Sequence, residues 1–76
     1  MDKTYTITLC PEPEGGFTVR VPALPEVVTY GEDEAEALAM AKDAIELVLA
    51  SRMERGEEIP DSDTVVVRSV SVSLAA

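Results

Sequence analysis

Two prolines, Pro22 and Pro25, place the strongest constraint on how this chain can fold. Proline has no backbone N–H to donate to a sheet ladder, and it holds the residue before it away from helical geometry. The segment 22–26, "PALPE", is therefore predicted to be an extended connector, with Leu24 as the one side chain large enough to anchor it. The residues before and after this connector must belong to separate elements.

The chain before the connector alternates with a period of two. Segments 4–10 and 17–21 place apolar side chains on one face and polar ones on the other, which is typical of strands with one buried face. The apolar positions are Tyr5, Ile7, Leu9, Phe17, Val19 and Val21. Residues 11–16, "PEPEGG", have the composition of a turn, so the two strands are predicted to form a hairpin. A short third strand at 27–30 follows the connector.

The residues after Gly31 predict a single helix. Asp33 stands where an N-cap is expected and Glu36 follows three residues later, which is the spacing of a capping box. The helical pattern continues to Arg55, and Gly56 is placed to end it. The kink thus turns the chain out of the sheet, and the acidic cap starts the helix at a fixed point.

Helical spacing predicts one apolar stripe that faces the sheet. Its members are Leu38, Ala41, Ile45, Val48 and Leu49. Met40 and Leu47 widen the apolar surface beyond this stripe. We interpret these two residues either as contacts between subunits or as part of a wide core stripe.

The last part of the chain, residues 64–76, predicts a fourth strand. Its apolar residues fall in two phases, Val65 and Val67 in one and Val70, Val72 and Leu74 in the other. A change of phase indicates a bulge or a second buried surface near Arg68.

The predicted order is β-β-β-α-β, which places the chain in the α+β class. A right-handed crossover through the helix gives a single four-stranded mixed sheet of order 3-2-1-4, with one long helix on one face. The valine-rich fourth strand then lies on an edge, where natural proteins rarely leave such a strand bare. We therefore expect another subunit or a partner to cover it, and we expect a homo-oligomer with Met40, Leu47, Val65 and Val67 at the subunit interface.

The charge balance restricts the partners. The 76 residues carry 15 acidic and six basic side chains, a net charge of −9, and no histidine. The bases are scattered, so direct binding to nucleic acid is not expected, whereas an acidic surface suits a basic protein partner. No run of residues is apolar enough to span a membrane and no signal peptide is evident, so we expect a cytoplasmic protein. Many glutamates without a single Asn or Gln suggest a thermophilic source.

No catalytic, cofactor or metal site is predicted. Cys10 is the one cysteine, which excludes an internal disulfide and gives no metal-binding pattern. The acids from Glu32 to Glu36 carry the oxygen ligands that Mg²⁺ prefers, but a capped helix with a solvated acidic turn explains the same residues. The sequence favours a binding protein over an enzyme.

The stretch "YTITLCPEPEGGFTVRVPALPEVVTYGEDEAEALAMAKDAIELVL" resembles the HicB-like antitoxin family. That family has an aromatic-rich strand, a "P-E-x-E-G-G" hairpin, a "P-x-L-P" connector and an "A-x-E-A-I" helix. Residues 5 to about 60 match in order and spacing. The resemblance implies a partial RNase H-like βββαβ domain, in agreement with the order derived above. The first-strand interior holds Thr6, Ile7 and Thr8 in place of a catalytic carboxylate, which implies the fold without its two-metal site.

The resemblance also implies a partner. Antitoxins of this family neutralise HicA, a small basic mRNA interferase, by docking on it and blocking its catalytic histidine. We expect the contact at the kink, with Glu26, Tyr30 and Glu32 as the partner-binding residues. Glu26 and Val27 depart from the Gly-Cys that usually follows the connector.

Two further expectations concern the domain content of the protein and an alternative function. Full-length antitoxins usually carry a C-terminal DNA-binding domain, whereas residues 1–76 read as a single HicB-like domain without one. The alternative to an antitoxin is an orphan, homo-oligomeric structural or regulatory protein without a toxin partner.

Overall fold

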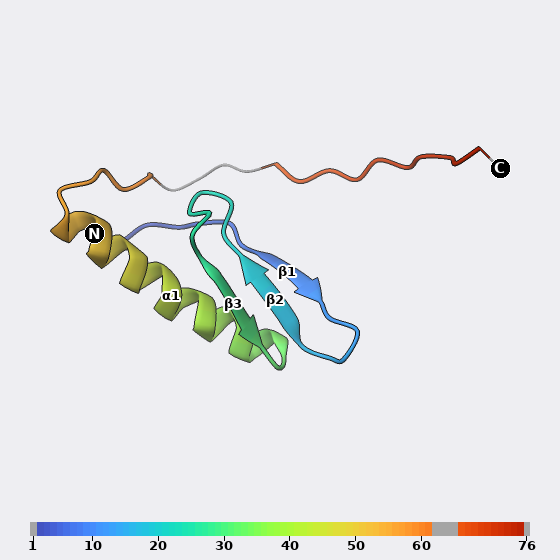
Figure 1. The fold of residues 1–76 in the computed structure, drawn as a ribbon, viewed down its shortest axis with the longest axis horizontal. Coiled ribbons are helices and arrows are strands. Elements are labelled where there is room, and N and C mark those ends of the chain that lie inside the picture. Colours follow the sequence, from blue (N-terminus) through green and yellow to red (C-terminus); the bar gives the residue numbers. More distant parts are fainter. Residues whose placement is uncertain (1, 62–65, 76) are drawn as a thin grey trace.

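The computed structural model describes residues 2–61 and 66–75. In these residues the chain forms β1 (Thr8–Pro11), β2 (Phe17–Arg20), β3 (Val28–Gly31) and α1 (Glu34–Glu54) (Figure 1). The strands form an antiparallel sheet of order β1-β2-β3, and α1 packs along one face of it. This arrangement confirms the predicted α+β class and the predicted order of the first four elements.

The hairpin between β1 and β2 is confirmed, but β1 begins at Thr8, so residues 4–7 of the predicted first strand are not part of it. Thr8 lies opposite Arg20 and Pro11 lies opposite Phe17. The chain reverses through Gly15 and Gly16, whose φ angles of 103° and 82° lie in the left-handed region that glycine adopts without strain. The paired glycines of "PEPEGG" therefore serve the turn that the sequence predicts.

The proline connector is a pair of consecutive turns around a buried leucine. The backbone N–H of Leu24 donates to Val21 O, and that of Val27 donates to Leu24 O, both at 2.9 Å. These three side chains are buried and form one core cluster, against which Ile45, Val48 and Leu49 of α1 pack. The prediction that Leu24 anchors the connector is confirmed. The prediction of an extended connector was wrong, because the two turns fold the backbone back on itself around Leu24.

The start of α1 also matches the prediction. The Asp33 carboxylate accepts a hydrogen bond from the Glu36 N–H at 2.8 Å, and the Glu36 carboxylate accepts one from the Glu32 N–H at 2.9 Å. The side chains thus satisfy backbone donors reciprocally, as in a capping box. The helix ends at Glu54, and Gly56 follows in left-handed geometry with a φ of 71°.

The inner face of α1 differs from the prediction at its first turn. Ala37 and Ala41 are buried against Val19 of β2, whereas Leu38 is 50% exposed. Ala37 lies directly against the backbone at Gly31, where a Cβ in place of the glycine hydrogen would overlap it. This close approach requires a small side chain and moves Leu38 to the edge of the interface, so its assignment to the core stripe was wrong.

The predicted fourth strand is not formed by the described residues 66–75. They run away from the body as an extended segment, coloured red in Figure 1, and every one of them is exposed. Val65 lies outside the described residues. Among the described residues the sheet has three strands, and the fourth strand of the predicted order 3-2-1-4 is not confirmed.

Candidate partner-binding surface

The sheet presents one face away from the helix. Strand register places two rows of side chains there, one made of Thr8, Arg20 and Val28 and the other of Cys10, Thr18 and Tyr30. Val28 and Tyr30 are exposed, and their neighbours Thr29 and Gly31 point to the helix side, where they are half-buried and buried. Tyr30, one of the predicted partner-binding residues, is thus on an accessible face.

Tyr30 is fixed across the hairpin. Its hydroxyl donates a hydrogen bond to Gly15 O at 3.0 Å, and its ring lies so close to Gly16 that a Cβ there would overlap it. On the same side, the Thr18 hydroxyl donates to the Glu12 carboxylate. These contacts join the turn, β2 and the end of β3 into one surface, which we call the hairpin end (residues 12–16 and 30–36).

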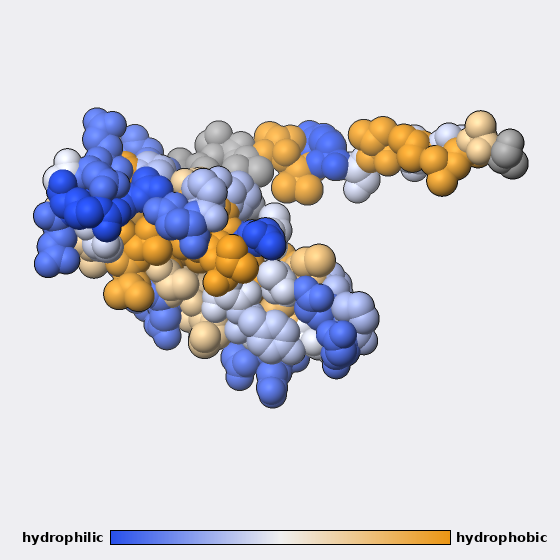
Figure 2. Space-filling model, viewed as in Figure 1, coloured by the Kyte–Doolittle hydropathy of each residue, from blue (hydrophilic) through white to orange (hydrophobic). Residues whose placement is uncertain are grey.

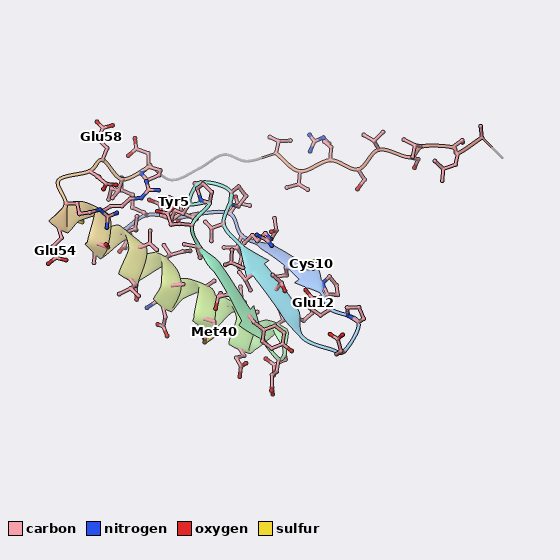
Figure 3. All side chains as sticks on the ribbon, in the orientation of Figure 1. Tyr5, Cys10, Glu12, Met40, Glu54 and Glu58 are labelled. Atoms are coloured by element: carbon pink, nitrogen blue, oxygen red, sulfur yellow. The ribbon has the colours of Figure 1, made fainter. Side chains whose placement is uncertain are left out.

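The hairpin end is uniformly acidic. It contains no Lys or Arg, and its acids are Glu12, Glu14, Glu32, Asp33, Glu34 and Glu36. Glu12 lies beside the turn, near Cys10 (Figure 3). The predicted partner residues Tyr30 and Glu32 therefore share a surface with Glu12 and Glu14, which the sequence prediction did not include. The sequence feature that could have indicated Glu12 and Glu14 is the "PEPEGG" turn, since the hairpin brings that turn to the end of β3.

Glu26 lies at the opposite end of β3. Its carboxylate accepts two hydrogen bonds from the Arg52 guanidinium, at 2.8 and 2.9 Å. A hydrogen bond from its own backbone, followed by the contact with Arg52, lowers the pKa of the Glu26 carboxyl below its ordinary value. The structure therefore does not bring Glu26 together with the other two predicted residues, and it gives this carboxylate an internal partner.

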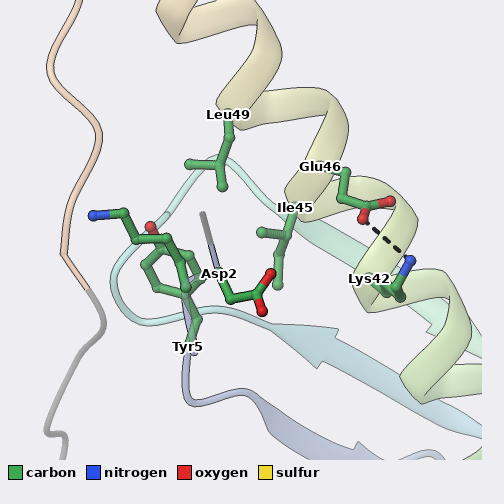
Figure 4. A pocket seen from close by; sticks show the side chains of 7 residues that line it. Asp2, Tyr5, Lys42, Ile45, Glu46 and Leu49 are labelled. Carbon is green, nitrogen blue, oxygen red and sulfur yellow. Dashed lines mark hydrogen bonds and ion pairs between the residues drawn. The ribbon is translucent and has the colours of Figure 1, made fainter.

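A groove lies between the N-terminal segment and α1. It has a volume of about 430 Å³ and is lined by Asp2, Lys3, Tyr5, Lys42, Ile45, Glu46 and Leu49 (Figure 4). The Tyr5 hydroxyl donates to Pro60 O, and Lys3 pairs with Asp61 at 2.7 Å. The bond with Lys3 lowers the pKa of Asp61 and raises that of Lys3. These contacts tie the chain that follows α1 to the N-terminal segment.

The residues predicted at a subunit interface are accessible where the structure describes them. Met40, labelled in Figure 3, and Leu47 lie seven residues apart on α1, and Leu47 is 73% exposed. Such exposure disfavours the alternative that both belong to a wide core stripe. Val67 is exposed in the extended segment, and Val65 lies outside the described residues. Their contact with a subunit stays a prediction.

The described residues offer no group of three His, Cys, Asp or Glu side chains placed to hold a metal ion. In the same part of the chain, α1 lacks the length and hydropathy needed to cross a membrane. Cys10 is an exposed, free thiol. What the described fold presents is a small acidic α+β domain with contact surfaces: a sheet face, an acidic end and an exposed apolar segment.

The comparison with known proteins places this domain in a family. Residues 4–76 match the family described as HicB_like antitoxin of bacterial toxin-antitoxin system, and the chain belongs to this family. It is an antitoxin family and not a family of enzymes.

Two relatives carry the antitoxin name. Over 56 residues, 74% of this chain, the sequence is 45% identical to Antitoxin HicB of Escherichia coli K12 and 43% identical to Antitoxin HicB 1 of Photorhabdus laumondii. The chain spans 41% and 36% of the length of these two relatives. A UPF0150 protein of Thermoplasma acidophilum is 38% identical over the same length, and 81% of that protein is covered.

Proposed function

We propose that this chain is an antitoxin-type binding protein that neutralises a small, basic HicA-like mRNA interferase by covering it. Membership of the HicB-like family is the observation that carries the proposal. The net charge of −9 supports it, because an acidic surface accelerates and orients association with a basic protein. The absence of histidine from the sequence fits a protein that binds without itself performing acid–base chemistry.

We propose the hairpin end as the contact surface, with Tyr30 and Glu32 at its centre and Glu12 and Glu14 beside them. Tyrosine is enriched at protein interfaces because it combines a large apolar ring with a polar tip. Here the ring is held in place by its bond to Gly15 O, so it loses little freedom on binding. Glu26, at the opposite end and paired with Arg52, stays a separate prediction.

The finer features of the predicted fold belong to the same proposal. We infer that residues 1–76 form one HicB-like domain whose sheet becomes four-stranded, with the RNase H-like order 3-2-1-4, once the C-terminal segment finds an edge to pair with. The protein would act in the cytoplasm as a homo-oligomer. The high glutamate content without Asn or Gln supports a thermophilic source.

The contact surface is tested by titrating the chain with the small basic protein encoded beside it in its genome. Glu32→Gln combined with Tyr30→Ala should weaken binding at least about tenfold, because it removes an aromatic anchor and a facing charge. Glu54→Gln, at the far end of α1, removes the same charge and should change the affinity less than about twofold. If the wild type, the double variant and Glu54→Gln bound the basic protein with equal affinity, the contact would have to lie outside the hairpin end.

One observation favours the second candidate, an orphan homo-oligomeric protein without a toxin. The C-terminal segment, residues 66–75, exposes apolar side chains and contains no acidic residue, which suits a contact with another copy of an acidic chain. Absence of binding to any basic partner, together with stable self-association, would support this candidate.

A further inference from the structure

The C-terminal segment, residues 66–75, is exposed, largely apolar and extended, and it pairs with no strand in the described part of the chain. Its large hydrophobic side chains are 67–92% exposed, namely Val66, Val67, Val70, Val72 and Leu74. Figure 2 shows them as a row of orange atoms that extends beyond the body of the molecule. Native proteins rarely leave such a row in water unless another surface covers it.

The outer part of this segment has the pattern of a strand with one buried face. Val70, Val72 and Leu74 alternate with Ser71 and Ser73, which puts the apolar side chains on one side and the hydroxyls on the other. A segment of this kind gains most by adding to an open sheet edge, where backbone hydrogen bonds and one apolar face are satisfied together.

β1 offers such an edge. Among the residues that the structure describes, no strand lies beside the outer side of β1 in the sheet of order β1-β2-β3. Its apolar side is also incompletely covered, because α1 packs on β2 and β3 and leaves Leu9 only half-buried. An added strand with one apolar face would form hydrogen bonds with the open edge of β1 and extend the apolar face of the sheet beside Leu9.

The described structure does not place this segment on its own sheet. Residues 66–75 run away from the body of the molecule, and every one of them is exposed (Figure 1). Within the described part of the chain, the alternating residues 70–74 and the outer edge of β1 therefore each lack a strand partner.

Charge identifies the partner that suits these residues. Arg68 is the only charged side chain between residues 66 and 75, whereas the whole chain has a net charge of −9. Two copies repel each other through most of their surface, and this segment is the part that can approach a second copy without like-charge repulsion. A basic toxin would not be attracted electrostatically to this segment, because the segment has no acidic side chain.

We propose that residues 70–74 of one chain add as a strand to the free edge of β1 in a second copy, and that the exchange is reciprocal. The resulting dimer has two-fold symmetry, since each copy gives a segment and receives one. The proposal stands on the exposed segment and the open edge, and it is independent of toxin binding.

Light scattering of the full chain across a concentration series tests the association. Val72→Asp should raise the dimer dissociation constant at least about tenfold, because it puts a charge on the apolar side of the added strand. The control Ser71→Asp carries the same charge on the opposite side and should change the constant far less. Circular dichroism should show α1 intact in both variants, since neither side chain contacts the body of its own chain.

Cross-linking through the exposed thiol of Cys10 in β1 tests the location. The wild-type chain is mixed with a Cys10→Ser, Ser73→Cys variant and treated with a short bismaleimide. We expect a covalent pair that contains one chain of each kind, and its loss when Val72→Asp is added to the second chain. A wild-type chain that stays monomeric at every concentration would overturn the proposal. So would a chain carrying both Cys10 and Ser73→Cys that cross-links only within itself.

Discussion

Among single residues, Gly15 and Gly16 shape the hairpin end, and the structure requires glycine at the two positions for different reasons. Gly15 and Gly16 both have positive φ, but space beyond Gly15 is open, whereas the Tyr30 ring fills the space beyond Gly16. The first glycine serves the turn alone, and the second also admits the tyrosine to its bond with Gly15 O. The sequence predicts the turn from "PEPEGG", but it does not show that Tyr30 lies across it, because that contact depends on strand register.

Gly16→Ala should therefore destabilise the protein more than Gly15→Ala. Each substitution forces a side chain into left-handed backbone geometry at a cost of about 1 kcal/mol, and the overlap with the Tyr30 ring and the Gly31 carbonyl should bring the total at Gly16 to about 2–3 kcal/mol. Urea unfolding followed by circular dichroism measures both values. Equal losses of stability in Gly15→Ala and Gly16→Ala would contradict this prediction, since they would mean that the neighbours of Gly16 move aside without cost.

At the scale of elements, the placement of α1 depends on a close approach rather than on hydrophobicity. Apolar periodicity correctly predicts Ala41, Ile45, Val48 and Leu49 on the inner face of the helix. It fails at Leu38, because hydrophobicity ranks leucine above alanine while the backbone at Gly31 leaves room only for Ala37. A periodicity argument has no information about how near the next element lies, and so it could not make this distinction.

The far end of α1 is tied to the connector by the Glu26–Arg52 pair, which makes stability depend on pH. The pKa of Glu26 is lowered in the folded protein from its ordinary value of 4.5, so the carboxylate's contribution is fully present above that pH. It is lost as pH falls through the lowered folded value. Glu26→Gln should therefore be less stable than wild type at neutral pH, and the difference should shrink below the ordinary value.

Chemical unfolding of both proteins over a pH series measures this difference. Arg52→Gln serves as a second variant: it should retain part of the acid dependence, because the largest cause of the shift is the hydrogen bond from the backbone of Glu26 itself. A difference between wild type and Glu26→Gln that stays constant from neutral to acid pH would contradict the assignment.

At the scale of the whole molecule, the protein combines an acidic body with a nearly uncharged apolar segment. Local patterns were enough to predict the hairpin, the connector, the capped helix and the family. They also predicted a strand in residues 64–76, but the edge on which such a strand would lie is not a local property. Residues 70–74 carry a strand pattern but pair with no strand among the described residues. In our proposal, a second copy of the chain supplies the sheet edge that they need.

The acidic body and the segment have separate tasks in this account. We propose that the hairpin end binds a basic toxin and that residues 70–74 bind a second copy of the chain. Loss of toxin binding in hairpin-end variants should leave dimerisation unchanged, because Tyr30 and Glu32 are not on the edge of β1 that receives the segment.

We propose that this chain neutralises a basic toxin by covering it, and an RNA cleavage assay tests this neutralisation. The small basic protein encoded beside the chain is incubated with RNA while the purified chain is added in increasing amounts, at low and at high salt. We expect RNA cleavage to stop at stoichiometric addition of the chain and the inhibition to weaken as salt rises, because the attraction between an acidic and a basic protein is screened by salt. Unchanged cleavage at low salt with the chain in excess would contradict it.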